Sequence, residues 1–390
     1  MKTVGIVGAS LAGLQTAREL RRQGHDGRLM LVGDEQHRPY DRPPLSKDFL
    51  AGKTGEADLA LEAEGEDLGI EWRLGTTATG LDVAARRVEL SDGTTLQADG
   101  LVIATGATAR SLPGVAGLDG IHTLRTLDDA RALRDDLSKA RRLVVIGGGF
   151  IGAEVAATMR SLGLDVTLVT SGPVPLAEVL GRQMAEAIAA RHEERGIRII
   201  RGASVTGLTG TGRADGVLLA DGRHLPADVV VIGIGVIPNT GWLRESGIEL
   251  GDGVICDEGG ATSAAGIVAV GDCAAWLDPA SGRHHRAGHW TGARQQAAVA
   301  AVTLLSGGEV RPGPQRPTYF WSDQYDMRIQ FSGRTQRMDS VSVEDGDVTG
   351  DGFLAVYRRD DRPVAVLGVN RLRLFSRRRR LLETEPVQVG

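Results

Sequence analysis

Two stretches of the chain share one pattern of apolar and small residues. In one of them, β-branched residues 144–146 lead into Gly147, Gly149 and Gly152 at the spacing G-x-G-x-x-G, and helix-forming residues follow. This order predicts a buried strand, a tight turn and a helix whose N-terminal N–H groups and positive dipole end face a pyrophosphate. The same spacing also fits a strand–helix turn that binds nothing, so the interpretation depends on the second stretch.

The second stretch opens the chain. Residues 3–8 predict a strand, residues 8–13 the turn, and residues 14–23 an amphipathic helix that ends at Gly24. Ser10 replaces the middle glycine, which the motif tolerates if the small side chain points away from the phosphate. Two such turns in one chain favour a protein that binds two dinucleotides.

The segments that follow the two turns also resemble each other. Each copy continues into short alternating runs joined by an Asp-Gly pair, which predicts hairpins, and then into a buried apolar strand. The chain is therefore expected to hold two similar α/β units, each with an inserted β-meander. The matching segments are 75–82 with 202–209, 88–93 with 217–222, and 98–106 with 227–235.

Composition narrows the class of protein. The chain has 390 residues, 42% of them hydrophobic, which is ordinary for two or three globular domains. No run approaches the ~18 apolar residues of a membrane span, and the net charge of −5 argues against a nucleic-acid binder. Met1 and Lys2 lead straight into the first strand, which leaves no room for a signal peptide and favours a cytoplasmic location.

The reactive side chains exclude several chemistries. Cys256 and Cys273 form no C-x-x-C pair, so neither a dithiol centre nor a zinc knuckle is expected. His284, His285 and His289 have no cysteine or carboxylate to complete a ligand set, so no metal site is expected. No nucleophile elbow supports acyl chemistry.

An acidic pair follows the second strand of the first unit. Asp34 and Glu35 lie about 20 residues after Gly13, where a carboxylate normally accepts hydrogen bonds from the adenosine ribose. Position favours Asp34, and the alternative is that either acid is a plain loop charge.

Residues 38–47, RPYDRPPLSK, form a loop that two successive prolines hold extended, so that Arg42 and Lys47 are delivered to fixed places. This loop resembles the hallmark loop of FAD-dependent NAD(P)H:ferredoxin reductases, flavoproteins that feed bacterial cytochrome P450s and Rieske-type oxygenases. They belong to the glutathione-reductase-like superfamily, whose disulfide reductases carry a redox-active cysteine pair in this region. This chain has none, so the resemblance implies that electrons leave from the flavin itself.

The resemblance covers the whole chain and implies its architecture. The fold class is α/β, with two Rossmann-like three-layer domains for FAD and NAD(P), their β-meanders, and a small α+β C-terminal domain. The expected boundaries are 1–113 with 242–316 for FAD, 114–241 for NAD(P), and 317–390 for the C-terminal domain. The implied cofactors are FAD and NADH, with NADPH as an alternative. The implied partner is an iron-sulfur ferredoxin, and the protein is expected to be a monomer or homodimer.

The resemblance also assigns site residues. A positive charge near the flavin ring favours its reduced anion; Lys47 is the candidate, held by an ion pair with Glu154. The alternative for Glu154 is an acid that only favours the helix dipole, for Asp272 a helix cap, and for Trp290 and Trp321 ordinary core packing. The expected cofactor-binding residues are Gly8, Ser10, Ala12, Gly13, Asp34, Arg42, Lys47, Ala78, Thr105, Arg125, Asp272, Trp290, Trp321, Gly147, Gly149, Ile151, Gly152, Glu154, Thr170 and Gly235.

One departure concerns the choice between nucleotides. The strand at 165–170 ends in Thr170 and Ser171, where NADH-preferring relatives usually carry an acid and NADPH enzymes have nearby arginines. Hydroxyls neither repel a 2′-phosphate nor bind it tightly, so weak discrimination with a preference for NADH is expected.

Two features leave alternatives open. The arginines at 371, 373 and 377–380 are either a solvated helix end or a docking site for an acidic ferredoxin. The fold is also similar to that of signalling flavoproteins like apoptosis-inducing factor and of NADH oxidases. The former usually carry extra segments absent here, and the latter rely on an early cysteine, whereas none precedes Cys256.

Overall fold

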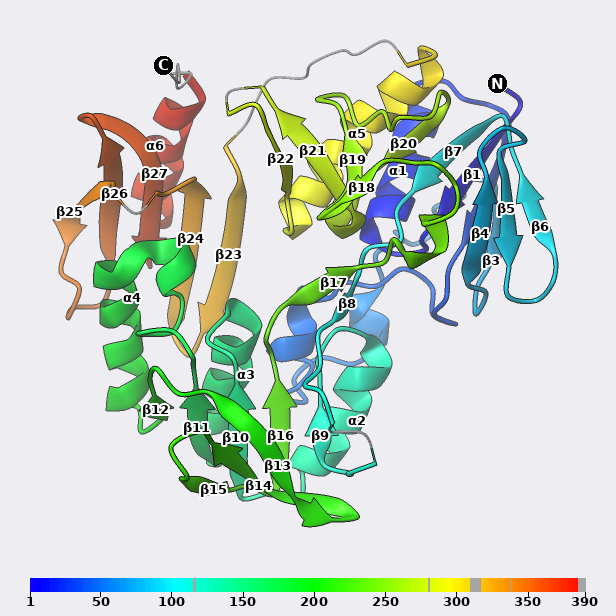
Figure 1. Ribbon diagram of the computed structural model, residues 1–390. Helices are drawn as coiled ribbons and strands as arrows, with labels where there is room; N and C mark the ends of the chain where they lie inside the picture. Colours follow the sequence, from blue (N-terminus) through cyan, green and yellow to red (C-terminus); the bar gives the residue numbers. More distant parts are fainter. Residues whose placement is uncertain (115–116, 280, 309–316, 337, 385–390) are drawn as a thin grey trace.

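The computed structural model describes residues 1–114, 117–279, 281–308, 317–336 and 338–384. Three parts are visible in Figure 1: the first dinucleotide unit at the upper right, the second at the bottom, and the C-terminal domain at the upper left. The expected α/β class with two dinucleotide-binding units is confirmed.

The first unit is a five-stranded parallel sheet in the order β20-β7-β1-β2-β3. Helices α1 and α5 pack against each other on one face, and the meander β4-β5-β6 shares an apolar core with the other face. The edge strand β20 comes from far downstream in the chain, so this unit is discontinuous. Its elements are β1 Thr3–Val7, α1 Leu11–Arg22, β2 Arg28–Val32, β3 Ile70–Arg73, β4 Ala78–Asp82, β5 Arg87–Leu90, β6 Thr95–Gln97, β7 Gly100–Ile103, β20 Ile267–Ala269 and α5 Trp290–Leu305.

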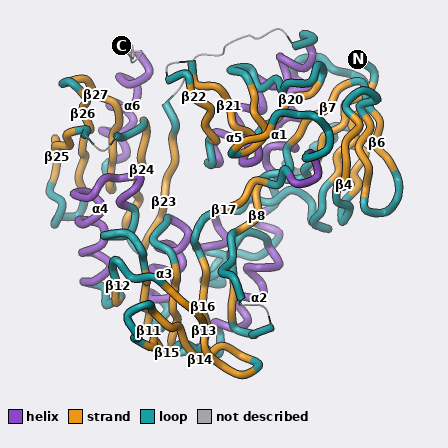
Figure 2. Tube along the Cα trace, viewed as in Figure 1, coloured by secondary structure: helices purple, strands orange, loops and turns teal. Residues whose placement is uncertain are grey.

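The second unit repeats this plan with a parallel sheet in the order β12-β11-β10-β16-β9 and the meander β13-β14-β15. Figure 2 shows α2 and α3 beside its strands. Helix α4 bends at Gly181, where φ is +69°. Its elements are β9 Ile121–His122, α2 Leu127–Leu137, β10 Arg142–Ile146, α3 Phe150–Ser161, β11 Asp165–Val169, α4 Ala177–Glu194, β12 Arg198–Ile200, β13 Val205–Thr211, β14 Arg213–Leu219, β15 His224–Pro226 and β16 Val229–Ile232.

The two repeated turns close in the same way. Gly8 and Gly147 have φ angles of +126° and +121°. A Cβ atom on Gly8 would lie 2.0 Å from the carbonyl oxygen of Ala104, and one on Gly147 would lie 2.1 Å from that of Gly233. Only glycine allows this approach of the turn to the neighbouring strand. The repeat seen in the sequence is therefore a repeat in three dimensions.

Short elements join the units. The antiparallel pair β8 and β17 connects the two units, and β18-β19-β21-β22 form a small sheet that the sequence did not predict. The bounds are β8 Ala107–Ala109, β17 Val236–Pro238, β18 Leu250–Gly251, β19 Gly253–Cys256, β21 Ala274–Asp278 and β22 Arg283–Arg286, with 3-10 turns η1 Pro43–Ser46, η2 Ala57–Leu59, η3 Gly241–Leu243 and η4 Gly271–Cys273.

The C-terminal domain is an antiparallel sheet in the order β23-β24-β27-β26-β25. The alternating runs at 352–357 and 364–369 predict a hairpin joined through residues 358–363, and it is present: Asp360 and Asp361 both have positive φ, as a two-residue turn between twisted strands requires. Helix α4 shares a core with one face of the sheet, and Phe375 of α6 packs against the other. The elements are β23 Tyr319–Gln324, β24 Met327–Gly333, β25 Ser340–Gly346, β26 Phe353–Arg359, β27 Arg362–Val369 and α6 Leu372–Thr384.

The α+β character of this domain agrees with the expectation. The domain boundaries expected after residues 113, 241 and 316 stay predictions. Residues 309–316 and 385–390, at the ends of two expected segments, lie outside the described part.

Candidate active site

A single cavity of about 550 Å³ collects residues from both dinucleotide units and from the C-terminal domain. This volume lies within the range of small-molecule sites. The N-terminal turn of α1, the loop after β2 and the N-terminal end of α3 all reach it. Expected site residues that line the cavity are Gly8, Ser10, Ala12, Asp34, Arg42, Lys47, Thr105, Arg125, Ile151, Glu154, Asp272, Trp290 and Trp321.

The N-terminus of α1 fits a pyrophosphate. Ser10 is the N-cap residue, and its side chain makes no capping hydrogen bond, which leaves N–H groups of the first turn for an anion. Its hydroxyl instead accepts from Nε of Arg42 at 3.3 Å, within the cavity lining. The proline-held loop thus brings a cation to the positive end of a helix, and both favour a negatively charged ligand.

The two acids after β2 have different surroundings. Glu35 pairs with Nη2 of Arg42 at 2.5 Å and accepts from the Tyr40 hydroxyl. Asp34 is exposed, lines the cavity and accepts only from the backbone N–H of Glu35, at 3.0 Å, among the described residues. The contact of Asp34 with a ribose hydroxyl stays a prediction, whereas Glu35 orients Arg42. The sequence did not reveal that second role.

Arg125 and Asp272 meet across the units. Nη2 of Arg125 lies 2.6 Å from Oδ2 of Asp272, and its Nε donates to the carbonyl of Ala107 at 2.9 Å. Thr126 followed by acids at 128 and 129 predicts a helix N-terminus, and a capping box between Thr126 and Asp129 does begin α2 directly after Arg125. A rigid helix start therefore holds Arg125 toward the cavity.

Lys47 and Glu154 form the pair that the resemblance implied. Nζ of Lys47 lies 2.7 Å from Oε2 of Glu154, and it also donates to the carbonyl of Pro43 at 2.9 Å. Glu154 is 3% exposed. A buried carboxylate next to a mostly buried ammonium is costly unless the two are paired, so this pair fixes the Lys47 ammonium at the cavity.

Aromatic rings border the cavity on the side of the C-terminal domain. Nε1 of Trp290 donates to Oδ1 of Asp41 at 2.8 Å, and the rings of Trp290 and Trp321 pack edge to face with centroids 5.8 Å apart. Burial raises the pKa of the Asp41 carboxyl. Sequence reasoning missed Asp41, although it lies inside the loop that it singled out.

Some expected residues lie outside the cavity lining. Ala78, the first residue of β4, is in the core between the meander and the sheet, and Gly13, Gly147, Gly149 and Gly152 shape the two turns. Thr170 is buried, and its hydroxyl accepts from the N–H of Gly172 at 3.2 Å, while Gly235 is exposed. Contacts of these residues with a cofactor stay predictions.

Metal ligands, reactive cysteines and membrane-spanning helices are three further features that the described part of the chain could carry. No group of three His, Cys, Asp or Glu side chains there is placed to hold a metal ion. Cys256 and Cys273 are free and buried, and burial raises the pKa of both thiols. Among these residues no helix is both long and apolar enough to span a membrane.

Comparison with known proteins gives matches over nearly the whole chain. Residues 2–297 match the family described as pyridine nucleotide-disulphide oxidoreductase, and residues 319–388 match the reductase C-terminal family. The ferredoxin reductase component of chlorobenzene dioxygenase from Cupriavidus sp. (strain PS12) is 40% identical, over 97% of this chain and 92% of that protein. Putidaredoxin reductase from Pseudomonas putida is 37% identical, over 99% and 94%.

Solved structures agree with these matches. The covalent putidaredoxin reductase–putidaredoxin complex has a TM-score of 0.93 at 36% identity and covers 98% of this chain and 93% of that one. The ferredoxin reductase for the CYP199A2 system from Rhodopseudomonas palustris also has a TM-score of 0.93 at 36% identity, with coverages of 100% and 96%. The chain therefore belongs to the pyridine nucleotide-disulphide oxidoreductase family, among the ferredoxin reductases that carry this C-terminal domain.

Proposed function

We propose that this protein is an FAD-dependent NAD(P)H:ferredoxin reductase that passes electrons to an iron-sulfur ferredoxin serving a cytochrome P450 or Rieske-type oxygenase. The observation that carries the proposal is the shared cavity: the N-terminal ends of α1 and α3 both reach it, with the Lys47–Glu154 pair between the two units. Two nucleotides bound at these turns would meet beside a fixed positive charge.

The residues have distinct tasks in this proposal. FAD, when bound, would supply the redox chemistry, since a flavin can accept a hydride from NAD(P)H and release its electrons one at a time. The first turn of α1 and Arg42 would bind the pyrophosphate of FAD, Asp34 would bind the adenosine ribose on one side of it, and Asp272 with Arg125 would bind the ribitol on the other. Lys47 supplies the positive charge that favours a reduced flavin. Neither cysteine takes part, because both are buried and unpaired.

The nucleotide preference is proposed to be NADH over NADPH, with modest discrimination. Thr170 is buried, with its hydroxyl against Gly148 and the N–H of Gly172, so the exposed side chain at this strand end is that of Ser171. A neutral hydroxyl can accept or donate to a ribose 2′-OH, but it provides no charge to bind or repel a 2′-phosphate.

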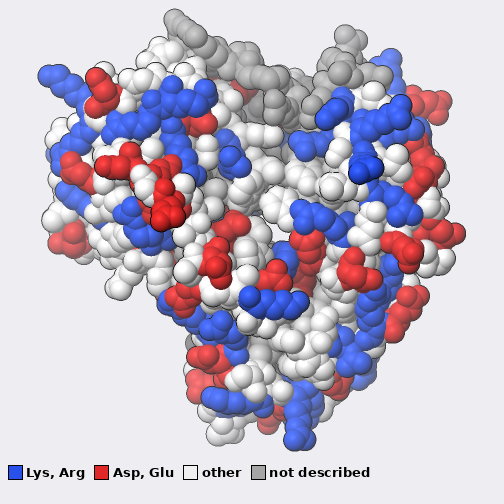
Figure 3. All heavy atoms as spheres, turned by 180° about the vertical axis from the view of Figure 1, so that it is seen from behind, with Lys and Arg blue, Asp and Glu red and all other residues white. Residues whose placement is uncertain are grey.

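We propose that the ferredoxin docks at α6. Arg373, Arg377 and Arg380 are exposed and form no ion pair with any residue that the structure describes. Figure 3 shows the molecule from behind, so the C-terminal domain lies at the upper right. Lys and Arg side chains gather there. A row of rings leads from α6 to the cavity: the Arg379 guanidinium lies 4.4 Å from the Tyr319 ring centroid, and Tyr319 stacks on Trp321 at 6.1 Å.

The test is anaerobic stopped-flow absorbance at the flavin band. The FAD-loaded protein is mixed with NADH or NADPH and then with a [2Fe-2S] ferredoxin. Rapid bleaching followed by ferredoxin-dependent reoxidation supports the proposal and ranks the two nucleotides. A long-lived reduced form that no ferredoxin reoxidises would instead support a signalling flavoprotein. Size-exclusion chromatography would decide between the monomer and homodimer expected from the sequence.

A further inference from the structure

The carboxylate of Glu154 is held from two sides by two different parts of the molecule. On the side of the first unit, Oε2 accepts from Lys47 and from the hydroxyl of Ser46. On the side of the C-terminal domain, Oε1 accepts from the hydroxyl of Ser322 in β23, at 2.6 Å. Every described contact of this carboxylate is therefore a donor, and each oxygen is fixed separately.

A chain of hydrogen bonds continues behind Ser322. Nε2 of Gln324 lies 3.0 Å from the Ser322 hydroxyl, Oε1 of Gln324 lies 2.8 Å from Nε2 of His192, and Nδ1 of His192 lies 3.3 Å from the Tyr325 hydroxyl. Glu154, Ser322, Gln324 and His192 are each at most 3% exposed. This series of hydrogen bonds crosses from α3 through β23 to α4 and ends at the partly buried Tyr325.

The direction of each hydrogen bond in this series follows from the carboxylate of Glu154 at its end. A carboxylate only accepts, so the Ser322 proton points to Glu154 and the Ser322 oxygen must accept from the amide of Gln324. The Gln324 oxygen then accepts from His192, whose ring proton lies on Nε2, and Nδ1 accepts from Tyr325. Burial lowers the pKa of His192 to about 4, which agrees with a neutral ring.

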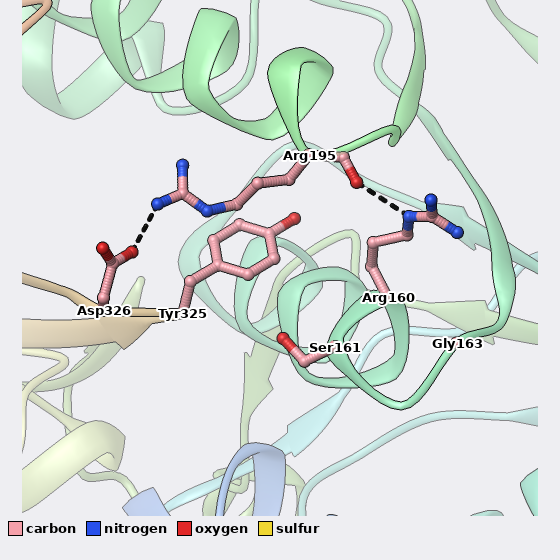
Figure 4. A pocket seen from close by; sticks show the side chains of 6 residues that line it. All are labelled: Arg160, Ser161, Gly163, Arg195, Tyr325 and Asp326. Atoms are coloured by element: carbon pink, nitrogen blue, oxygen red, sulfur yellow. Dashed lines mark hydrogen bonds and ion pairs between the residues drawn. The ribbon is translucent and has the colours of Figure 1, made fainter.

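The outer end of the chain is also anchored. Tyr325 lines a shallow surface hollow of about 740 Å³ together with Arg160, Ser161 and Arg195 (Figure 4). The Arg195 guanidinium lies 4.8 Å from the Tyr325 ring centroid and pairs with Asp326 at 2.5 Å. The hollow lies at the C-terminal end of α3, whereas Glu154 lies near the N-terminal end of this helix. The series of hydrogen bonds therefore runs alongside α3.

We propose that Ser322, Gln324 and His192 are positioning residues for the reductase reaction, which the C-terminal domain and α4 supply to the Lys47–Glu154 pair. Aligned donors that end on one carboxylate polarise one another and stabilise its charged form. They hold the carboxylate of Glu154 in one orientation, and Glu154 in turn holds the Lys47 ammonium at the cavity. This inference rests on the proposed function of that cavity.

This series of hydrogen bonds positions Glu154 and does not conduct protons. Proton transfer along it would require Gln324 to pass through an imidic acid form, since an amide nitrogen gives up a proton reluctantly. None of the three residues lines the cavity. Their effect on the reaction therefore passes through Glu154.

The test compares two buried serines of one sheet. Ser322 in β23 and Ser332 in the adjacent β24 are both fully buried, but the Ser332 hydroxyl has no hydrogen-bond partner among the described residues. Ser322→Ala and Ser332→Ala are compared in FAD content, thermal unfolding, flavin reduction by NADH, and the midpoint potential of bound FAD. Gln324→Met, which keeps the volume, and Ser322→Thr, which keeps the hydroxyl, complete the set.

Ser322→Ala is expected to retain FAD but to reduce it about ten-fold more slowly, as for the loss of one hydrogen bond to a charged group. The midpoint potential of its FAD should also fall, because a carboxylate of Glu154 with one donor fewer holds the Lys47 ammonium less firmly at the cavity. Gln324→Met should shift both in the same direction, while Ser322→Thr and Ser332→Ala should match the wild type.

Several results would overturn the inference. One is a Ser322→Ala protein with the rate and potential of the wild type, and another is equal damage from Ser322→Ala and Ser332→Ala. ¹⁵N NMR of His192 tests the bond directions without any turnover: a proton on Nδ1 would contradict them. A wild-type protein that NADH does not reduce would instead count against the proposed function. The NMR result would still test the hydrogen-bond directions in that case.

Discussion

Arg125 and Asp272 are 147 residues apart in sequence, yet Nη2 of Arg125 lies 2.6 Å from Oδ2 of Asp272. One precedes α2 of the second unit and the other follows β20, the late edge strand of the first. The ion pair thus joins the two units at the cavity and aligns two polar groups toward the same space.

Asp272→Asn tests this connection. The change leaves the half-buried Arg125 guanidinium without its anion and is expected to cost about 1–2 kcal/mol of stability and to weaken FAD retention. FAD content after desalting and the unfolding temperature measure both effects. Glu71→Gln, which breaks the exposed pair with Arg28, is the control and should change neither. Full FAD retention in Asp272→Asn would remove Asp272 from the binding site.

Lys47→Met tests the positive charge at the cavity. Without it, the reduced flavin loses electrostatic stabilisation, so flavin reduction by NADH is expected to slow by about 10²-fold while FAD stays bound. Stopped-flow bleaching measures the rate. Lys53→Met removes an ammonium whose side chain is 71% exposed and should react like the wild type. If Lys47→Met did so too, the pair with Glu154 would have no part in the chemistry.

Two glycines of the second turn should respond differently to alanine. Gly149 has a φ of −82°, and a Cβ atom added to it would meet no heavy atom within 4 Å. Gly149→Ala should therefore fold normally, yet raise the KM for NADH at least about ten-fold, because the methyl group occupies the approach of the pyrophosphate. Gly147→Ala should instead destabilise the fold by about 3 kcal/mol or more. Unchanged NADH kinetics in Gly149→Ala would argue against this turn as the nucleotide site.

Protonation of His192 should make stability depend on pH. Its pKa falls from the ordinary 6.5 to about 4 through burial. The unfolded chain therefore binds the proton first, and stability present above pH 6.5 is lost as the pH falls toward 4, by about 3 kcal/mol in total. Denaturant unfolding measured from pH 7 to 4 should show a flatter curve for His192→Gln than for the wild type. His284→Gln, at an exposed site, should not flatten it.

Charge reversal on α6 tests ferredoxin docking. Replacing Arg373, Arg377 and Arg380 by Glu is expected to lower kcat/KM for an acidic ferredoxin by about 10²-fold at low salt, with flavin reduction by NADH unchanged. The loss should shrink as the ionic strength rises. Reversing Arg141, Arg182 and Arg223 of the second unit gives the same net charge and should have little effect. Equal losses from both sets would mean that net charge, not this helix, decides the rate.

Local patterns in the sequence predicted much of the fold. The repeated glycine turns, the capping residue Thr126 and the Asp360–Asp361 hairpin each depend on a few neighbouring residues, and each is present as expected. The sheet β18-β19-β21-β22 was missed because its strands are two to five residues long and carry no clear periodicity.

The sequence likewise predicted some residues of the candidate site and missed others. Lys47 and Glu154 were found through resemblance to a family, since 107 residues separate them. Ser322 lies 168 residues from Glu154 and was not found, because a serine in a strand gives no signal of its partner. Glu35 was an alternative ribose ligand in the sequence, whereas the structure turns it toward Arg42. Only the tertiary fold determines which of two adjacent acids meets the arginine.

Strand β20 is synthesised long after the strands that it joins, and this affects folding during translation. Roughly 160 residues separate β7 from the strand that covers its outer edge, and a ribosome adds about 5–20 residues each second. The first-made unit must then wait on the order of ten seconds or longer with an open strand edge and no α5 against α1. The second unit, whose sheet is complete at β16, is free to fold before it. The part of the chain that is translated first is thus among the last to be finished, and its uncovered edge is where a nascent-chain chaperone would have most to protect.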